Sequence, residues 1–280
     1  MDPKDQTRRD PLNEFVRRES ASAGQDTRRL RASGQRFSAG EHVWLASAGA
    51  EQARSLVSDA GYPLQPDLFT QIQRRQGEDR FTYGELVALS GDFYKTPRDL
   101  FDEKPGPVPW LWEGNDISNL RELFAKELQH IQTLSTGKPP PYPEDNIRLA
   151  WNAKSFTELA LRNERHFGWH NVLAYCEHHM SALKLARKAR GAHDEVFREA
   201  LATNAFADHF LTDAFSAGHV RTPRKQIIEW AERQGLNLRV AGALSKLLHD
   251  QDGHVDIESI HGEAETADGL GLHVLNAERN

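Results

Sequence analysis

Residues Asn204 to Val220 read Asn-Ala-Phe-Ala-Asp-His-Phe-Leu-Thr-Asp-Ala-Phe-Ser-Ala-Gly-His-Val, and the rest of the chain is interpreted from them. His209 and Asp213 stand four residues apart, so on a helix of about 3.6 residues per turn they lie on one face. Their nitrogen and oxygen atoms can then converge on one point, as metal ligands do. Gly218 can end this helix and turn His219 back toward the same site. Imidazole and carboxylate together suit zinc among the common ions.

The neighbours of this pair strengthen the metal interpretation. Four large apolar residues predict that the helix is buried: Phe206, Phe210, Leu211 and Phe215. Burying imidazoles and a carboxylate among aromatic rings costs free energy unless the polar groups are paired or coordinate a cation. A surface hydrogen bond between His209 and Asp213 is the alternative.

The run from His209 to Asp213, followed six residues later by His219, resembles the zinc-dependent phospholipase C family and the related fungal zinc nucleases. The resemblance extends more weakly over roughly residues 40 to 252. It implies an all-α fold, a single multi-helix domain that holds three zinc ions. In that family the matching Asp bridges two zinc ions, and the second His binds a separate one.

Composition describes a soluble globular protein with one large domain or two small ones. The chain has 280 residues, a net charge of −6 and a single cysteine, Cys176, which excludes an intrachain disulfide. The acidic balance gives no reason to expect binding to bulk nucleic acid. No apolar run is long enough to span a membrane and no secretory signal is visible, so we expect a cytoplasmic protein or a specialised export route.

Apolar periodicity separates three regions. Residues 1–38 are locally basic and almost without periodicity, which predicts a disordered extension. We expect the helical domain over residues 39–254 and an irregular tail over 255–280. Within the domain, apolar residues recur at three and four residues from 117 to 134, which predicts an amphipathic helix. The segment 155–190 has a helical pattern throughout.

Two further ligand candidates come early in the chain. His42 falls in the first turns of a helix that begins near Ser38, and Trp44 follows it; the resembled phospholipases carry a zinc-binding His and an aromatic residue at this place. A buried helical run stops at Gly91 and delivers Asp92, which matches an Asp of the family's dinuclear pair. A surface His and a plain helix-ending Asp are the alternatives.

Later candidates are less regular. Asn163-Glu-Arg-His166-Phe resembles the His-Phe pair that supplies another ligand of the family's dinuclear site. The family closes its site with a His and a Glu one helical turn apart, whereas here Gly253 stands four residues after His249. The carboxylate must therefore come from Asp252 or Asp250, or be absent.

The resemblance implies a partition of these ligands among two or three zinc ions. One ion would bind Asp92, His166, His209 and Asp213; a second would bind His42 and Asp213; a third would bind His219 and His249 with Asp252. Asp92 is also the candidate catalytic residue. The family's mature chain begins at a Trp whose amine binds zinc, but here about forty residues precede His42, so that ligand is missing unless proteolysis creates a new terminus.

The implied activity is hydrolysis of a glycerophospholipid to diacylglycerol and a phosphorylated head group by water that zinc activates. A phospholipid substrate and transient contact with a membrane surface would follow. A single-strand nuclease on the same scaffold is one alternative, with nucleic acid as its partner. The other is a non-catalytic helical protein that keeps an incomplete zinc centre for stability or partner binding.

Overall fold

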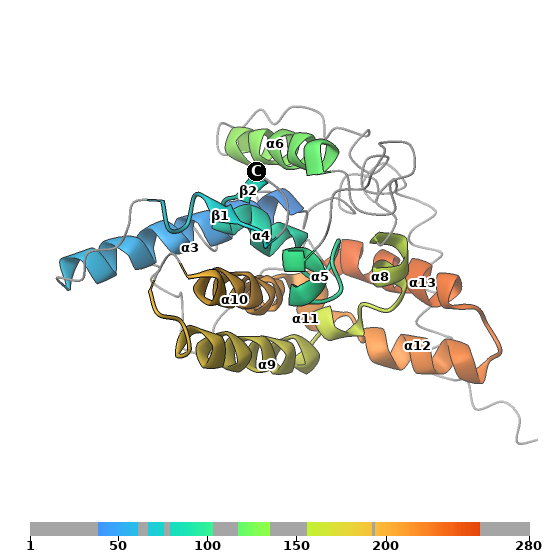
Figure 1. Ribbon diagram of the computed structural model, residues 1–280. Helices are drawn as coiled ribbons and strands as arrows, with labels where there is room; N and C mark the ends of the chain where they lie inside the picture. Colours follow the sequence, from blue (N-terminus) through green and yellow to red (C-terminus); the bar gives the residue numbers. More distant parts are fainter. Residues whose placement is uncertain are drawn as a thin grey trace, which may run out of the picture.

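The computed structural model describes residues 39–60, 67–75, 79–102, 117–134, 156–191 and 194–252. In these ranges the chain is mostly helical, which confirms the predicted all-α class. The predicted extension over 1–38 and tail over 255–280 lie outside the described residues. The elements, labelled as in Figure 1, are α3 (Ala39–Asp59), β1 (Ile72–Gln73), β2 (Arg80–Phe81), α4 (Tyr83–Leu89), α5 (Pro97–Asp102), α6 (Ile117–Leu134), α8 (Phe156–Leu161), the 3-10 helix η3 (Glu164–His166), α9 (Trp169–Ala186), α10 (Glu195–Asp213), α11 (Ala217–Arg221), α12 (Arg224–Arg233) and α13 (Leu238–Asp252).

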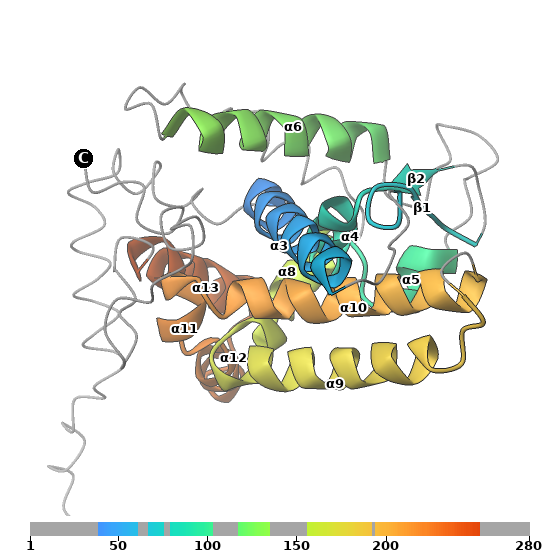
Figure 2. The same cartoon turned by 90° about the vertical axis from the view of Figure 1, so that its left-hand side faces the viewer.

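Helix α10 lies between the other helices that surround the site. Figures 1 and 2 both show α9 on one side of it and α3 with α4 on the other, while α6 covers α3 from outside. Asp194 caps α10 by accepting a hydrogen bond from the Val196 amide, as a helix-starting Asp does. The buried residues of α10 include both His209 and Asp213. The helix that bears the strongest motif is therefore packed on two sides.

The apolar core lies between α10 and the elements above it. Helix α4 begins at a capping box between Thr82 and Glu85, and its apolar residues Leu86 and Val87 are buried against Phe206 of α10. Fully burying such a side chain stabilises the fold by about 1.5–3 kcal/mol. The antiparallel ribbon of β1 and β2, with Ile72 opposite Phe81, adds to the same core. A smaller apolar cluster joins α12 and α13.

Two expectations about helix limits were wrong. The segment 155–190 is not one helix: it breaks into α8, η3 and α9, and Gly168 turns the chain before α9 with a φ of 56° that favours glycine. The central helix ends at Asp213, not at Gly218, because a turn closed by the Ser216 amide on the Asp213 carbonyl separates α10 from α11. Gly218 lies inside α11.

No helix within the described ranges is both long and apolar enough to cross a bilayer.

Candidate metal centre

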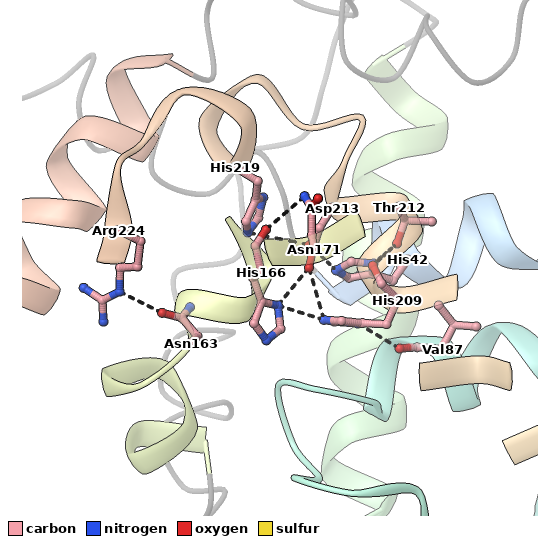
Figure 3. Close-up of polar contacts among 10 residues, drawn as sticks. All are labelled: His42, Val87, Asn163, His166, Asn171, His209, Thr212, Asp213, His219 and Arg224. Carbon is pink, nitrogen blue, oxygen red and sulfur yellow. Dashed lines mark hydrogen bonds and ion pairs between the residues drawn. The ribbon is translucent and has the colours of Figure 1, made fainter. Parts of the chain in front are cut away.

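Four imidazoles converge on the carboxylate of Asp213 (Figure 3). His166 Nδ1 lies 2.8 Å and His209 Nε2 3.7 Å from Asp213 Oδ2. On the other oxygen, Oδ1, His219 Nε2 lies at 3.6 Å and His42 Nε2 at 3.7 Å. All five side chains are buried, with exposed fractions from 0% for His209 to 8% for His219. We call these five residues the imidazole–carboxylate cluster.

The cluster is assembled from four separate elements. His209 and Asp213 come from the last turn and a half of α10, as the i, i+4 spacing predicts. His42 enters from the first turn of α3, and His166 from η3. The turn after Asp213 leads directly into α11, which carries His219. The tertiary packing of α3 and η3 against α10 therefore decides whether the cluster forms.

Asp92 reaches the cluster through an unusually close approach of the backbone. Its ligand oxygen lies within 4.8 Å of ligand atoms of His42 and His209. The preceding Gly91 has a φ of 75°, and a Cβ there would stand 2.7 Å from His209 Cδ2 and 2.9 Å from His166 Cε1. Only a glycine permits both this φ and this contact without strain.

The candidate ligands fall into two groups of three. One group is His42, Asp92 and His209; the other is His166, Asp213 and His219, each with ligand atoms within 4.8 Å of one another. Every residue expected around the dinuclear pair is thus present in one place. The grouping differs from the partition implied by the resemblance, which placed His166 with Asp92 and His219 with His249.

His249 lies beside the cluster without belonging to either group of three. Its ring centroid is 4.7 Å from that of His219 and 6.2 Å from that of Phe167. Gly218 makes this contact possible, because a Cβ at that position would lie 2.6 Å from His249 Cδ2. Asp252 is the last residue of α13. The side chains of Asp250 and Asp252 lie outside the described part of the structure, so the third carboxylate is not placed.

Hydrogen bonds select the tautomers of two histidines. His209 Nδ1 lies 3.0 Å from the Val87 carbonyl, which only accepts, so this nitrogen carries the proton. The Thr212 hydroxyl donates to the His209 carbonyl at 2.7 Å, which leaves its oxygen to accept from His42 Nδ1 at 2.6 Å. In both rings Nε2 therefore keeps its lone pair and faces Asp213. This is how outer hydrogen bonds orient metal-binding imidazoles.

Burial sets the charge of the cluster. It lowers the pKa of His209 to about 4 and, aided by the neighbouring imidazoles, lowers the pKa of His42 and His219 well below the usual value. Burial likewise raises the pKa of the Asp213 carboxyl group well above its ordinary value. At neutral pH the imidazoles are uncharged, which is the form that binds metal. A divalent cation would compensate the buried carboxylate that desolvation otherwise disfavours.

Arg224, which sequence reasoning did not single out, connects the segments that carry His166 and His249. Its guanidinium donates to the side chain of Asn163 at 3.0 Å, to the carbonyls of Ala160, Leu161 and Ala241, and to the hydroxyl of Ser245. Asn163 precedes η3, and Ser245 stands one turn before His249 in α13.

Thr212, Gly91 and Arg224 carry no metal-binding group, so a search for ligand spacing passes over them. The positive φ of Gly91 had only one sequence signal, its place at the end of a buried apolar run.

A scan against models of known protein families, a search of curated proteins and a search of solved structures each gave no match.

Proposed function

We propose that this protein is a zinc-dependent phosphodiesterase of the phospholipase C type, which hydrolyses a glycerophospholipid to diacylglycerol and a phosphorylated head group. One observation carries the proposal: four neutral imidazoles surround a buried carboxylate, with Asp92 next to them. A buried set of this kind is costly unless a cation occupies it. The phospholipid substrate itself rests on the resemblance of the sequence.

The donor set fits zinc. Imidazole nitrogen and carboxylate oxygen are the ligands that zinc takes in catalytic sites, and the hydrogen bonds from His42 and His209 to oxygen acceptors resemble the supports of known zinc ligands. His42, Asp92 and His209 would hold one ion, and His166, Asp213 and His219 another. His249, beside His219, is the candidate ligand of a third. Zinc bound there supplies an activated water at neutral pH and positive charge for phosphate oxygens.

The protein's own contribution is to hold the ligands in place among aromatic rings. The ring of Phe167 is tilted against that of His219, with their centroids 4.7 Å apart, and the ring of Phe210 meets that of His166 edge-on at 5.0 Å, so aromatic rings pack against two of the imidazoles. Burial raises the pKa of the Asp92 carboxyl group. Asp92 is our candidate catalytic residue as well as a candidate ligand, since its carboxylate oxygen lies within 4.8 Å of ligand atoms of His42 and His209.

The test is a pair of assays on purified, zinc-supplemented protein. Release of phosphorylated head group from water-soluble dihexanoyl phosphatidylcholine is measured beside cleavage of single-stranded DNA. We expect hydrolysis of the lipid, and its rate should fall at least 100-fold in Asp213→Asn and His209→Ala. His170→Ala, a histidine of α9 outside both ligand groups, is the matched control and should keep the rate.

Three results would count against the proposal. Cleavage of DNA without hydrolysis of phospholipid would assign a nuclease. Activity that survives His209→Ala with unchanged metal content would remove the metal assignment. Bound zinc without either activity would favour the non-catalytic alternative.

A further inference from the structure

Helix α9 presents an apolar stripe to solvent. With about 100° between successive residues, six side chains fall within roughly 100° of its circumference, opposite the buried Asn171, Ala174 and Ala182. Trp169 is 82% exposed, Leu173 65% and Met180 53%. The α9 stripe consists of Trp169, Val172, Leu173, Cys176, Met180 and Leu183. Figures 1 and 2 place α9 at the outer edge of the helical layers, with α10 on its inner side.

The α9 stripe begins next to the metal centre. Trp169, its most exposed member, follows His166 by three residues. Gly168, immediately before it, donates its backbone N–H to the carbonyl of His219 at 2.9 Å. A surface that covered the stripe would therefore lie against the same end of the fold that holds the imidazole–carboxylate cluster.

The stripe ends in a basic group. Lys184, Arg187, Lys188 and Arg190 are all exposed at the C-terminal end of α9 and just after it. Arg187 continues the angular position of Trp169 and Met180. Glu177, an acidic neighbour at the edge of the stripe, is paired with Arg165 of the same chain. The surface thus combines a Trp, aliphatic side chains and several exposed positive charges, the composition that favours the interface of an anionic bilayer.

We propose that the α9 stripe docks this protein on anionic phospholipid bilayers and presents the metal centre to the lipid layer. The presentation of the metal centre to lipid rests on the proposed function. The docking itself does not, since the stripe is defined without the metal site. A second copy of the chain fits less well. Two 18-residue helices pair over about 27 Å, and a stable interface of roughly 800 Å² per partner would have to extend well beyond the stripe.

A probe at Cys176, the only cysteine and an exposed residue in the middle of the stripe, tests the docking directly. The full-length Asp213→Asn protein, labelled there with bimane, is mixed with vesicles of phosphatidylcholine and phosphatidylglycerol; Asp213→Asn keeps the lipid from being consumed. We expect a blue shift that saturates with lipid, weakens in high salt, and is at least tenfold weaker with phosphatidylcholine alone. The same label at Arg98→Cys in a Cys176→Ser chain should not shift, because Arg98 lies on α5 and is 87% exposed.

A matched pair of variants tests the apolar part. Leu173→Asp should weaken vesicle binding at least tenfold, since it places a charge where the exposed Leu side chain would enter the bilayer surface. Leu56→Asp, on α3 with a nearly equal exposed fraction of 64%, should bind as the unsubstituted chain does. In otherwise unsubstituted protein, Leu173→Asp should lower the ratio of the hydrolysis rate on vesicles to that on dihexanoyl phosphatidylcholine at least tenfold.

The outcomes separate this inference from the proposed function. Hydrolysis of the soluble lipid without vesicle binding refutes the docking surface and keeps the phosphodiesterase. Vesicle binding without hydrolysis of the soluble lipid refutes the phosphodiesterase and keeps the docking surface. A dimer in sedimentation, with the Cys176 probe already shielded before lipid is added, would overturn docking in favour of self-association. Equal binding by Leu173→Asp and Leu56→Asp would also overturn it.

Discussion

Replacing Gly91 with alanine should damage the fold and the metal centre by two separable effects. The φ of 75° costs a non-glycine residue about 1–2 kcal/mol. The added Cβ would stand 2.7 Å from His209 Cδ2 and 2.9 Å from His166 Cε1, well inside ordinary contact, so both rings must move. Such overpacking typically costs a further 1–3 kcal/mol, roughly. We expect metal-free Gly91→Ala to lose about 2–5 kcal/mol of unfolding free energy.

Gly235→Ala is the matched control for the backbone effect. Its φ is 65°, and a Cβ there would meet nothing within 4 Å. It should lose only the backbone cost, about 1–2 kcal/mol, and keep its zinc affinity. Metal ligands must be held to within about 0.5 Å, so the displaced rings should weaken zinc binding by Gly91→Ala at least tenfold. Urea denaturation and zinc titration measure the two quantities. Equal stability losses and equal zinc affinities in the two variants would refute the packing of Gly91 against the imidazoles.

Three further perturbations test the surroundings of the cluster. Arg224→Met should lose about 3–5 kcal/mol of unfolding free energy in urea denaturation, because buried carbonyl acceptors lose their hydrogen-bond donor. Arg233→Met, at an exposed position of the same helix, should change the unfolding free energy by less than about 0.5 kcal/mol. Gly218→Ala should displace His249 and lower the number of bound zinc ions by metal analysis; unchanged zinc would contradict a role for His249. Metal-free protein should lose stability as the pH falls from 6.5 toward 4, because His209, with its pKa lowered to about 4, takes up its proton more readily when unfolded. This one group contributes at most about 1.4 kcal/mol per pH unit, and the raised pKa of Asp213 acts in the opposite direction. The test therefore compares the urea midpoint against pH with that of His209→Gln, and an equal pH dependence in the two proteins would exclude burial of His209 in the neutral form.

Much of the fold follows from local pattern. The spacing of apolar residues from 117 to 134 predicts α6, and the buried run that stops at Gly91 predicts α4, because hydrophobic periodicity and a glycine are local signals. The break between α8 and α9 was not predicted, since the apolar pattern continues through it. The chain turns there because Gly168 adopts a positive φ and bonds to the His219 carbonyl, a contact made across 51 residues.

The candidate site shows a similar division. His209 and Asp213 could be paired from their spacing on one helix, but spacing alone says nothing about His42 and Asp92, which meet them only through packing. The place of Asp92 at the end of a buried run made it a candidate, and resemblance to a family pointed to both residues, but neither signal places them beside His209. The role of Gly218 was misread as a helix end because sequence gives no sign that His249 would lie against it.

Metal analysis by mass spectrometry on the purified full-length protein tests the central claim most directly. We predict two or three equivalents of zinc per chain, fewer in His209→Ala, and an unchanged number in His170→Ala. Folded, unsubstituted protein that binds no zinc when it is supplied, or His209→Ala protein that keeps the full complement, would contradict the gathering of these imidazoles and carboxylates as a metal centre.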